Sequence, residues 1–186
     1  MAIPATDRWP DEILDFWFGE LGAKDWFSKN EAVDAQIQRR FRSLHEQLSQ
    51  KSPSGFLTSP SKAFAAIILF DQLPRNLYRN DPRSFASDLL ALDIARELIT
   101  KKWDANIAHD QRVFAYLPFE HSENLADQDE AVRMIEPLGD DDFTRYAHTH
   151  RNVIVRFGRF PHRNTILGRT STPQEKEYLR QPGSGF

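Results

Sequence analysis

The sequence predicts an all-α protein built from stacked antiparallel helix pairs. Apolar residues recur at steps of three and four over several stretches, which is the spacing of one helix face. Helix-start residues stand before many of these stretches, and no stretch alternates apolar and polar residues long enough to favour a β-sheet. The loops between the predicted helices are short, so neighbouring helices should run antiparallel, and we expect about seven or eight helices.

Two long helices carry the clearest apolar stripes. In the first, the stripe consists of Val33, Ile37, Phe41, Leu44 and Leu48. Asn30 lies just before it as a candidate N-cap, because its side chain can accept hydrogen bonds from the first helical amides. In the second, the stripe consists of Phe143, Ala147, His150, Ile154 and Phe157, and Gly158 follows as a left-handed stop. We expect both stripes, within residues 33–48 and 143–157, to be buried.

Shorter helices are predicted from their start and stop signals at about residues 10–19, 60–72, 82–101, 112–117, 122–136 and 173–180. Ser59 with Pro60 marks one helix start, and Thr172 with Glu175 forms a capping box at another. Pro118 should interrupt the helix that begins near residue 112. The residues expected to face inward are Phe85, Leu89, Leu92 and Leu98 in the helix at 82–101, and Leu125, Val132 and Ile135 in the helix that Ser122 can cap.

Length and composition limit the class of protein. A chain of 186 residues with 40% hydrophobic residues is long enough for a core, and without a visible linker we expect one domain, residues 1–186. The net charge of −3 favours neither a nucleic-acid nor a membrane partner. The lack of cysteine excludes disulfides and cysteine nucleophiles. No apolar run reaches the roughly 20 residues of a membrane span, and residues 1–7 lack a signal-peptide pattern, so we expect a cytoplasmic protein.

A polar segment, Asp71-Gln72-Leu73-Pro74-Arg75-Asn76, closes the helix predicted at 60–72. Asp71 and Arg75 can act on a ligand at this helix end. Alternatively, they pair with each other or with neighbouring helix ends and order the turn, since buried polar groups mostly satisfy one another.

The segment His121-Ser122-Glu123-Asn124 stands between two apolar helices. His121 and Glu123 are two residues apart, so they cannot share a helix face, and this is not the two-histidine spacing of a zinc site. A nucleophilic role for Ser122 lacks support, because the chain contains no Gly-x-Ser-x-Gly elbow. His121 is a candidate general acid or base. No motif calls for a metal or a cofactor, and we expect neither.

Two histidines lie close together on the helix at 143–157. His148 should point toward solvent, whereas His150 shares the apolar stripe. His150 can be a hydrogen-bonded core residue. It can also be a site residue, because the helix aims it inward and leads directly into a segment rich in arginine.

That segment runs from Arg156 to Arg169 and interleaves cations with aromatic, glycine and proline residues. No aspartate or glutamate occurs between residues 151 and 170. Guanidinium groups bind carboxylate and phosphate oxygens in pairs, so the segment can hold an anionic ligand. It can equally hold Asp71, Glu123 or Asp127 in a structural ion network. The candidate ligand-binding residues are Arg75, Asn76, Arg156, Arg159, His162, Arg163 and Asn164.

Several motifs occur together along the chain: Trp26-Phe27-Ser28-Lys29, the segment from Asp71 to Asn76, Tyr116-Leu117-Pro118-Phe119, the segment from His121 to Gln128, and Arg156 to Arg169. With these motifs the chain resembles the bacterial family labelled domain of unknown function 924, over nearly its whole length. The resemblance implies a TPR-like α/α superhelix. It implies no reaction, substrate or catalytic residue.

Two functions fit these observations. A TPR-like binding module would accept a peptide, a protein segment or a small anionic ligand. An enzyme would use His150 or His121 as general acid or base, with Asp71 and the arginines around the same cavity. Metal-dependent chemistry is a third option that no ligand spacing demands. We expect Asp71 or Arg75 to lie near His150, Arg156 or Arg163, because buried charges need partners.

Overall fold

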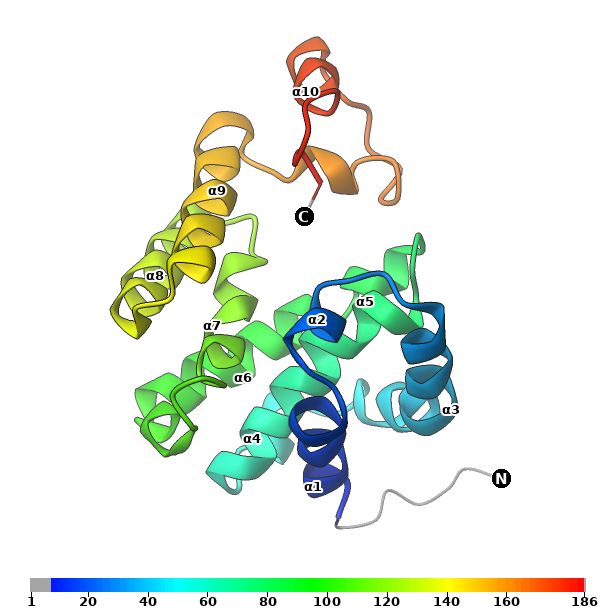
Figure 1. Cartoon of the computed structure of the whole chain (residues 1–186), viewed down its shortest axis with the longest axis vertical. Helices are drawn as coiled ribbons and strands as arrows, with labels where there is room; N and C mark the ends of the chain where they lie inside the picture. Colours follow the sequence, from blue (N-terminus) through cyan, green and yellow to red (C-terminus); the bar gives the residue numbers. More distant parts are fainter. Residues whose placement is uncertain (1–7, 186) are drawn as a thin grey trace. The chain divides into compact units, whose positions relative to one another are not determined.

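The computed structural model describes residues 8–185 as helices joined by turns and short loops (Figure 1). Within this range there is no β-strand, so the all-α prediction is confirmed. Residues 1–7, on which the absence of a signal peptide was judged, and Phe186 lie outside the described range. The helical chain forms two compact units. One holds the chain up to Arg79 together with Arg83–Pro118, and the other holds Asn80–Pro82 and the chain from Phe119 onward.

Seven α-helices begin in the described part of the first unit. They are α1 (Trp9–Leu14), α2 (Ala23–Trp26), α3 (Glu31–Leu48), α4 (Pro60–Ile67), α5 (Leu73–Leu77), α6 (Asp88–Thr100) and α7 (Val113–Glu120), of which the last two residues of α7 belong to the second unit. The second unit continues with α8 (Leu125–Ile135), α9 (Asp141–Phe157) and α10 (Pro173–Tyr178).

The predicted helix starts are confirmed by their hydrogen bonds. Asn30 accepts from the amides of Ala32 and Val33, and Ser59 accepts from the amide of Lys62. Thr172 and Glu175 form the reciprocal capping box of α10. At the other end of α9, Gly158 adopts a φ of +67°, the left-handed conformation that glycine accepts without a side-chain clash.

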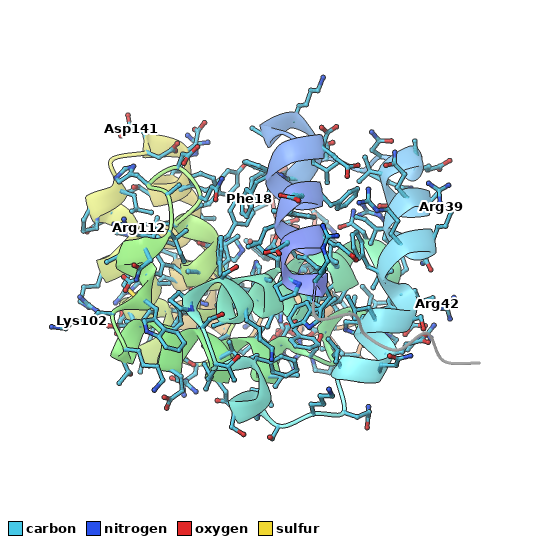
Figure 2. The ribbon with its side chains drawn as sticks, turned by 90° about the horizontal axis from the view of Figure 1, so that it is seen from below. Phe18, Arg39, Arg42, Lys102, Arg112 and Asp141 are labelled. Atoms are coloured by element: carbon cyan, nitrogen blue, oxygen red, sulfur yellow. The ribbon has the colours of Figure 1, made fainter. Side chains whose placement is uncertain are left out.

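The first unit buries an aromatic core. Helix α4 packs against α1 and α6, and α3 packs against α5. The fully buried aromatic side chains of this unit are Phe16, Trp17, Phe56, Phe70 and Phe114. The apolar stripe of α3 faces this core, with His45 buried and Leu44 only half-buried. Arg39 and Arg42 are exposed on the outer side of the same helix (Figure 2).

The second unit is organised by one helix pair. Helices α8 and α9 are consecutive, are joined by a short connection and pack side by side, so they form an antiparallel hairpin (Figure 1). One face of α9 contributes Val153 and Ile154 to an apolar cluster. The cluster is completed by Phe160, Phe157 and Tyr178 from the end of α9 and the segments that follow it. An antiparallel pair was predicted here, whereas the TPR-like arrangement stays a prediction.

Four local predictions are wrong. Phe85 belongs to a separate 3-10 turn, Pro82–Phe85, because α6 begins only at Asp88. The predicted inward face, which was counted in helical steps from Phe85, is therefore displaced at its start, and Leu89 is 75% exposed. Leu125 is 42% exposed, since the inward positions of α8 are taken by Asp127 and Gln128. Asn124, not Ser122, caps α8.

Helix boundaries also differ from the prediction at two places. Pro118 lies inside α7, which continues to Glu120. The helix predicted at 60–72 is α4 followed by a π-helical turn, Ile68–Gln72, and then by α5. A second π-helical turn, Asp15–Glu20, extends α1. Such turns insert one residue into the helical ladder and leave no signature in apolar periodicity.

Within residues 8–185, no helix combines the length and apolar character that crossing a bilayer requires.

Candidate functional site

The motif from His121 to Gln128 folds into a turn that is closed by its own side chains. The Ser122 hydroxyl donates to Asp127 at 2.7 Å, and the Asn124 amide donates to the Ser122 hydroxyl oxygen at 3.2 Å. The Gln128 amide group donates to the carbonyls of Glu120 and Ser122, each at 2.6 Å. Carbonyl groups at the end of a helix lack donors from the helix itself, and Gln128 provides a donor for those at and just after the end of α7. This fixes the backbone on both sides of His121.

This turn presents Glu120 to His150 of α9. Glu120 Oε1 lies 2.9 Å from His150 Nδ1, and the two side chains are almost fully buried, at 5% and 7% exposed. The same nitrogen lies 2.9 Å from the carbonyl oxygen of Tyr146, one helical turn earlier. The His121 ring lies near that of His150, with the two ring centroids 6.3 Å apart. Both histidines predicted as acid–base candidates therefore belong to one cluster of the second unit.

The same turn also presents Glu123 to the arginine-rich segment. Glu123 accepts two hydrogen bonds from the Arg169 guanidinium, at 2.7 and 2.9 Å, and one from the Phe160 amide at 2.8 Å. Arg169 in turn donates to the Phe160 carbonyl at 3.1 Å. Burial disfavours the charged carboxylate, but these donors outweigh it and hold the pKa of Glu123 below its ordinary value.

The Glu123–Arg169 pair fixes Phe160 beside the histidine. The Phe160 ring meets the His150 ring nearly edge to face, with centroids 5.5 Å apart and planes at 78°. The Arg163 guanidinium lies 4.7 Å from the centre of the Phe160 ring, and the His162 ring lies 5.6 Å from it. His150 is thus held by Glu120 through one nitrogen and by Phe160 through ring packing.

A second ion pair joins Arg159 to the start of α10. Arg159 donates two hydrogen bonds to Glu175, at 2.6 and 2.9 Å, and one to the Thr170 carbonyl. Glu175 is only 2% exposed. The bonds from Arg159, against the opposing effect of burial, lower the pKa of Glu175 to about 2, and the Thr172 amide adds to this.

A pocket of about 530 Å³ lies beside this ion pair. Its lining residues are Arg156, Phe157, Arg159, Thr172, Gln174 and Glu175. We refer to it as the Arg156 pocket. Unlike Arg159, the exposed Arg156 side chain has no aspartate or glutamate partner among residues 8–185, and its guanidinium lies 4.7 Å from the centre of the Phe157 ring.

The candidate residues of the first unit are engaged in contacts within that unit. Asp71 is fully buried and accepts a 2.6 Å hydrogen bond from Gln72. Arg75 lies 2.8 Å from Asp88, 3.8 Å from Asp71, and donates to the Ser84 carbonyl. Asn76 donates to Asp34 at 2.8 Å. The expected proximity of Asp71 or Arg75 to His150, Arg156 or Arg163, and a ligand role for Arg75 and Asn76, stay predictions.

The remaining candidates have structural contacts. Asn164 is fully buried and donates to the Ser171 hydroxyl at 3.0 Å. His148 is exposed, as predicted, and its Nε2 lies 2.7 Å from Glu136. In the described part of the chain, no three histidine or acidic side chains come together in an arrangement that could hold a metal ion.

Two carboxylates of these clusters were missed in the sequence. Glu120 lies at the end of an apolar helix and matches no motif, and Glu175 was identified only as a capping residue. Their partners are 30 and 16 residues away in the chain, so no local spacing could have identified the pairs. Glu123 had been named as a possible partner of the arginines, and it holds Arg169.

The comparisons with known proteins place this helical chain in a family. It matches the family described as bacterial protein of unknown function (DUF924) over residues 13–183. It is also similar to the solved structure of a protein of unknown function, ATU0120 from Agrobacterium tumefaciens. The sequence identity is 40% and the TM-score 0.86, covering 91% of this chain and 96% of that one. A search of the curated proteins found no match. Because the family match spans nearly the whole chain, the protein belongs to the DUF924 family.

Proposed function

We propose that the protein binds a small anionic ligand, a carboxylate or a phosphate, in the Arg156 pocket. The observation that carries this proposal is the charge balance of the lining. Glu175 is neutralised by Arg159 through two hydrogen bonds, so Arg156 contributes a positive charge that no carboxylate of the described chain offsets. A guanidinium group that lacks a carboxylate partner in the protein favours an oxyanion ligand.

The other lining residues fit such a ligand. Phe157 supplies an aromatic wall, and Thr172 and Gln174 are polar lining residues at the start of α10. The volume of about 530 Å³ lies within the range of roughly 300–1,000 Å³ usual for small-molecule sites. In this proposal the ion pairs Arg159–Glu175 and Arg169–Glu123 have a structural role, and Arg156 binds the ligand.

Titration with inorganic phosphate and with citrate, followed by calorimetry, tests the proposal. We expect saturable binding to the wild type, weakened about tenfold by Arg156→Gln, which corresponds to about 1.4 kcal/mol. Arg145→Gln is the matched control, because it removes the same charge from the exposed first half of α9, outside the pocket. Equal binding by wild type and Arg156→Gln would show that the anion does not use this pocket.

An acid–base enzyme is the second candidate function, with His150 or His121 as the acting residue. The contact that favours it is the buried Glu120 carboxylate 2.9 Å from His150. In that case the Arg156 pocket would hold an anionic group of the substrate, and Arg156→Gln would raise KM more than it lowers kcat. The broader roles of a TPR-like peptide-binding module and a cytoplasmic location, which suits a chain without cysteine, also stay proposals.

A further inference from the structure

We infer that the ligand of the Arg156 pocket is an organic monocarboxylate, a molecule with one carboxylate group and an apolar body. The inference rests on the anion-binding function proposed above, and it selects one of the two classes of anion named there. Three features of the pocket carry it: the net charge of the lining, the way Arg156 is held, and the volume.

The lining of the pocket has one uncompensated positive charge. Arg156 and Arg159 contribute two positive charges, and Glu175 contributes one negative charge, which it keeps because its pKa is about 2. A monocarboxylate neutralises the remaining charge. A phosphate monoester carries nearly two negative charges near neutral pH, because its second pKa is about 6, and it would leave a negative charge next to Glu175. The charge balance therefore favours the carboxylate.

Arg156 is held beside the pocket by an aromatic ring. Its guanidinium carbon lies over the Phe157 ring, 4.7 Å from the centre, where the electrons of the ring attract a cation. That ring packs against Tyr178 of α10, with centroids 5.2 Å apart. Burial raises the pKa of Tyr178, and the nearby charge of Arg156 opposes the rise. The cation is thus positioned near α10 while its N–H groups have no carboxylate partner among residues 8–185.

The pocket is larger than an anionic head group. Its volume is about 530 Å³, whereas one water molecule in the liquid takes up about 30 Å³. A free phosphate or acetate ion, with about five non-hydrogen atoms, would fill only part of this space. Phe157 offers apolar surface to the rest of a ligand. We therefore expect the acid to carry an apolar body.

Another pocket of similar volume provides an internal contrast. It measures about 540 Å³, belongs to the first unit, and its charged lining residues are the two carboxylates Asp15 and Glu20. A lining of this sign repels a carboxylate ligand. We therefore expect one monocarboxylate to bind per chain, in the Arg156 pocket.

Calorimetric titration of the full chain with benzoate, phenyl phosphate and acetate tests the ligand class. Benzoate and phenyl phosphate share a ring but differ in charge at about pH 8, whereas benzoate and acetate share a charge but differ in size. We expect benzoate to bind more tightly than either of the other two. Phenyl phosphate binding as tightly as benzoate would overturn the selection by charge, and acetate doing so would overturn the apolar body.

Gln174→Lys tests whether the charge of the lining sets the preference. Gln174 is exposed, so the added cation leaves the Arg159–Glu175 pair in place. One more positive charge near the ligand should shift the ratio of the two dissociation constants about fivefold in favour of phenyl phosphate. Gln50→Lys is the matched control, because Gln50 is exposed and lies in the first unit, outside the pocket. An unchanged ratio in Gln174→Lys, or an equal shift in both variants, would contradict the inference.

Failure of this inference can be distinguished from failure of the proposed function. If phosphate and citrate bind through Arg156 but benzoate is not preferred, the pocket binds anions of another class, and only the inference fails. If no anion binds to the wild type, the proposed function fails as well.

Discussion

At the scale of single residues, the partners of a buried histidine decide which charge state the fold supports. His45 is surrounded by hydroxyl groups and aromatic rings, and burial lowers its pKa to about 4, against a smaller opposite effect of Glu46. His150 instead has a buried carboxylate in contact with Nδ1. The environment of His45 therefore favours the neutral imidazole.

The low pKa of His45 predicts an acid-sensitive fold. Because the pKa is about 4 in the folded chain and 6.5 in the unfolded chain, the unfolded chain binds more protons between these values. The stabilisation is complete above pH 6.5 and is lost as the pH falls toward 4, up to about 3 kcal/mol. Urea unfolding at several pH values in this range should give a free energy of unfolding that rises with pH, and His45→Gln should reduce the slope of this rise. The exposed His109→Gln should keep the wild-type slope, and an equal reduction in both variants would contradict the assignment.

Residue roles could be predicted from the sequence only where the partner is local. Asn30, Ser59 and Thr172 act on amides two or three residues away, so their motifs are visible in the chain. Glu120 and Glu175 act on His150 and Arg159, which are brought near only by tertiary packing. Arginine richness showed that a charged cluster exists, but not which guanidinium groups are already neutralised.

At the scale of elements, α10 depends on contacts made outside itself. It has six residues, fewer than the roughly 12–15 that an isolated helix needs in water. The capping box orders its first turn, and the bonds from Arg159 to Glu175 tie that turn to the segment after α9. The order of α10 should therefore follow the charge of Glu175.

Glu175→Gln should loosen α10, because the amide keeps the capping hydrogen bond but loses the ion pair with Arg159. Hydrogen exchange of residues 170–185, measured by mass spectrometry, should be faster in the variant at neutral pH. The pKa of Glu175 is about 2 in the folded chain and 4.5 in the unfolded chain, so its contribution is present above pH 4.5 and is lost toward pH 2. The difference between the proteins should shrink over that range. Glu177→Gln, on the same helix with an exposed partner, is the control and should exchange like the wild type.

Element prediction succeeded where apolar spacing and capping agree, as in α3 and α9. It failed where tertiary contacts change the helical ladder or turn polar side chains inward. The π-helical turn at Ile68–Gln72 leads directly into α5, so the helical path continues past the predicted helix end near residue 72. In α8, the buried Asp127 and Gln128 satisfy the preceding turn, and Leu125 remains exposed.

At the scale of the whole molecule, the prediction of one domain means that the two compact units should unfold together. The chain passes from one unit to the other at three points: after Arg79, after Pro82 and after Pro118. The last point falls within α7, whose hydrogen-bonded backbone continues to Glu120. A helix that continues across a boundary opposes independent unfolding, because fraying one part removes hydrogen bonds from the other. These features support unfolding as one unit.

The distribution of tryptophan allows this prediction to be tested without mutation. All four tryptophans, Trp9, Trp17, Trp26 and Trp103, lie in the first unit, whereas helices α8, α9 and α10 belong to the second. Tryptophan fluorescence therefore reports on the first unit, and circular dichroism at 222 nm reports on the helices of both. If the chain is one cooperative domain, the two urea transitions should have the same midpoint and slope. Helical signal that persists after the fluorescence transition, or is lost before it, would show that the units unfold separately and that the chain is two domains.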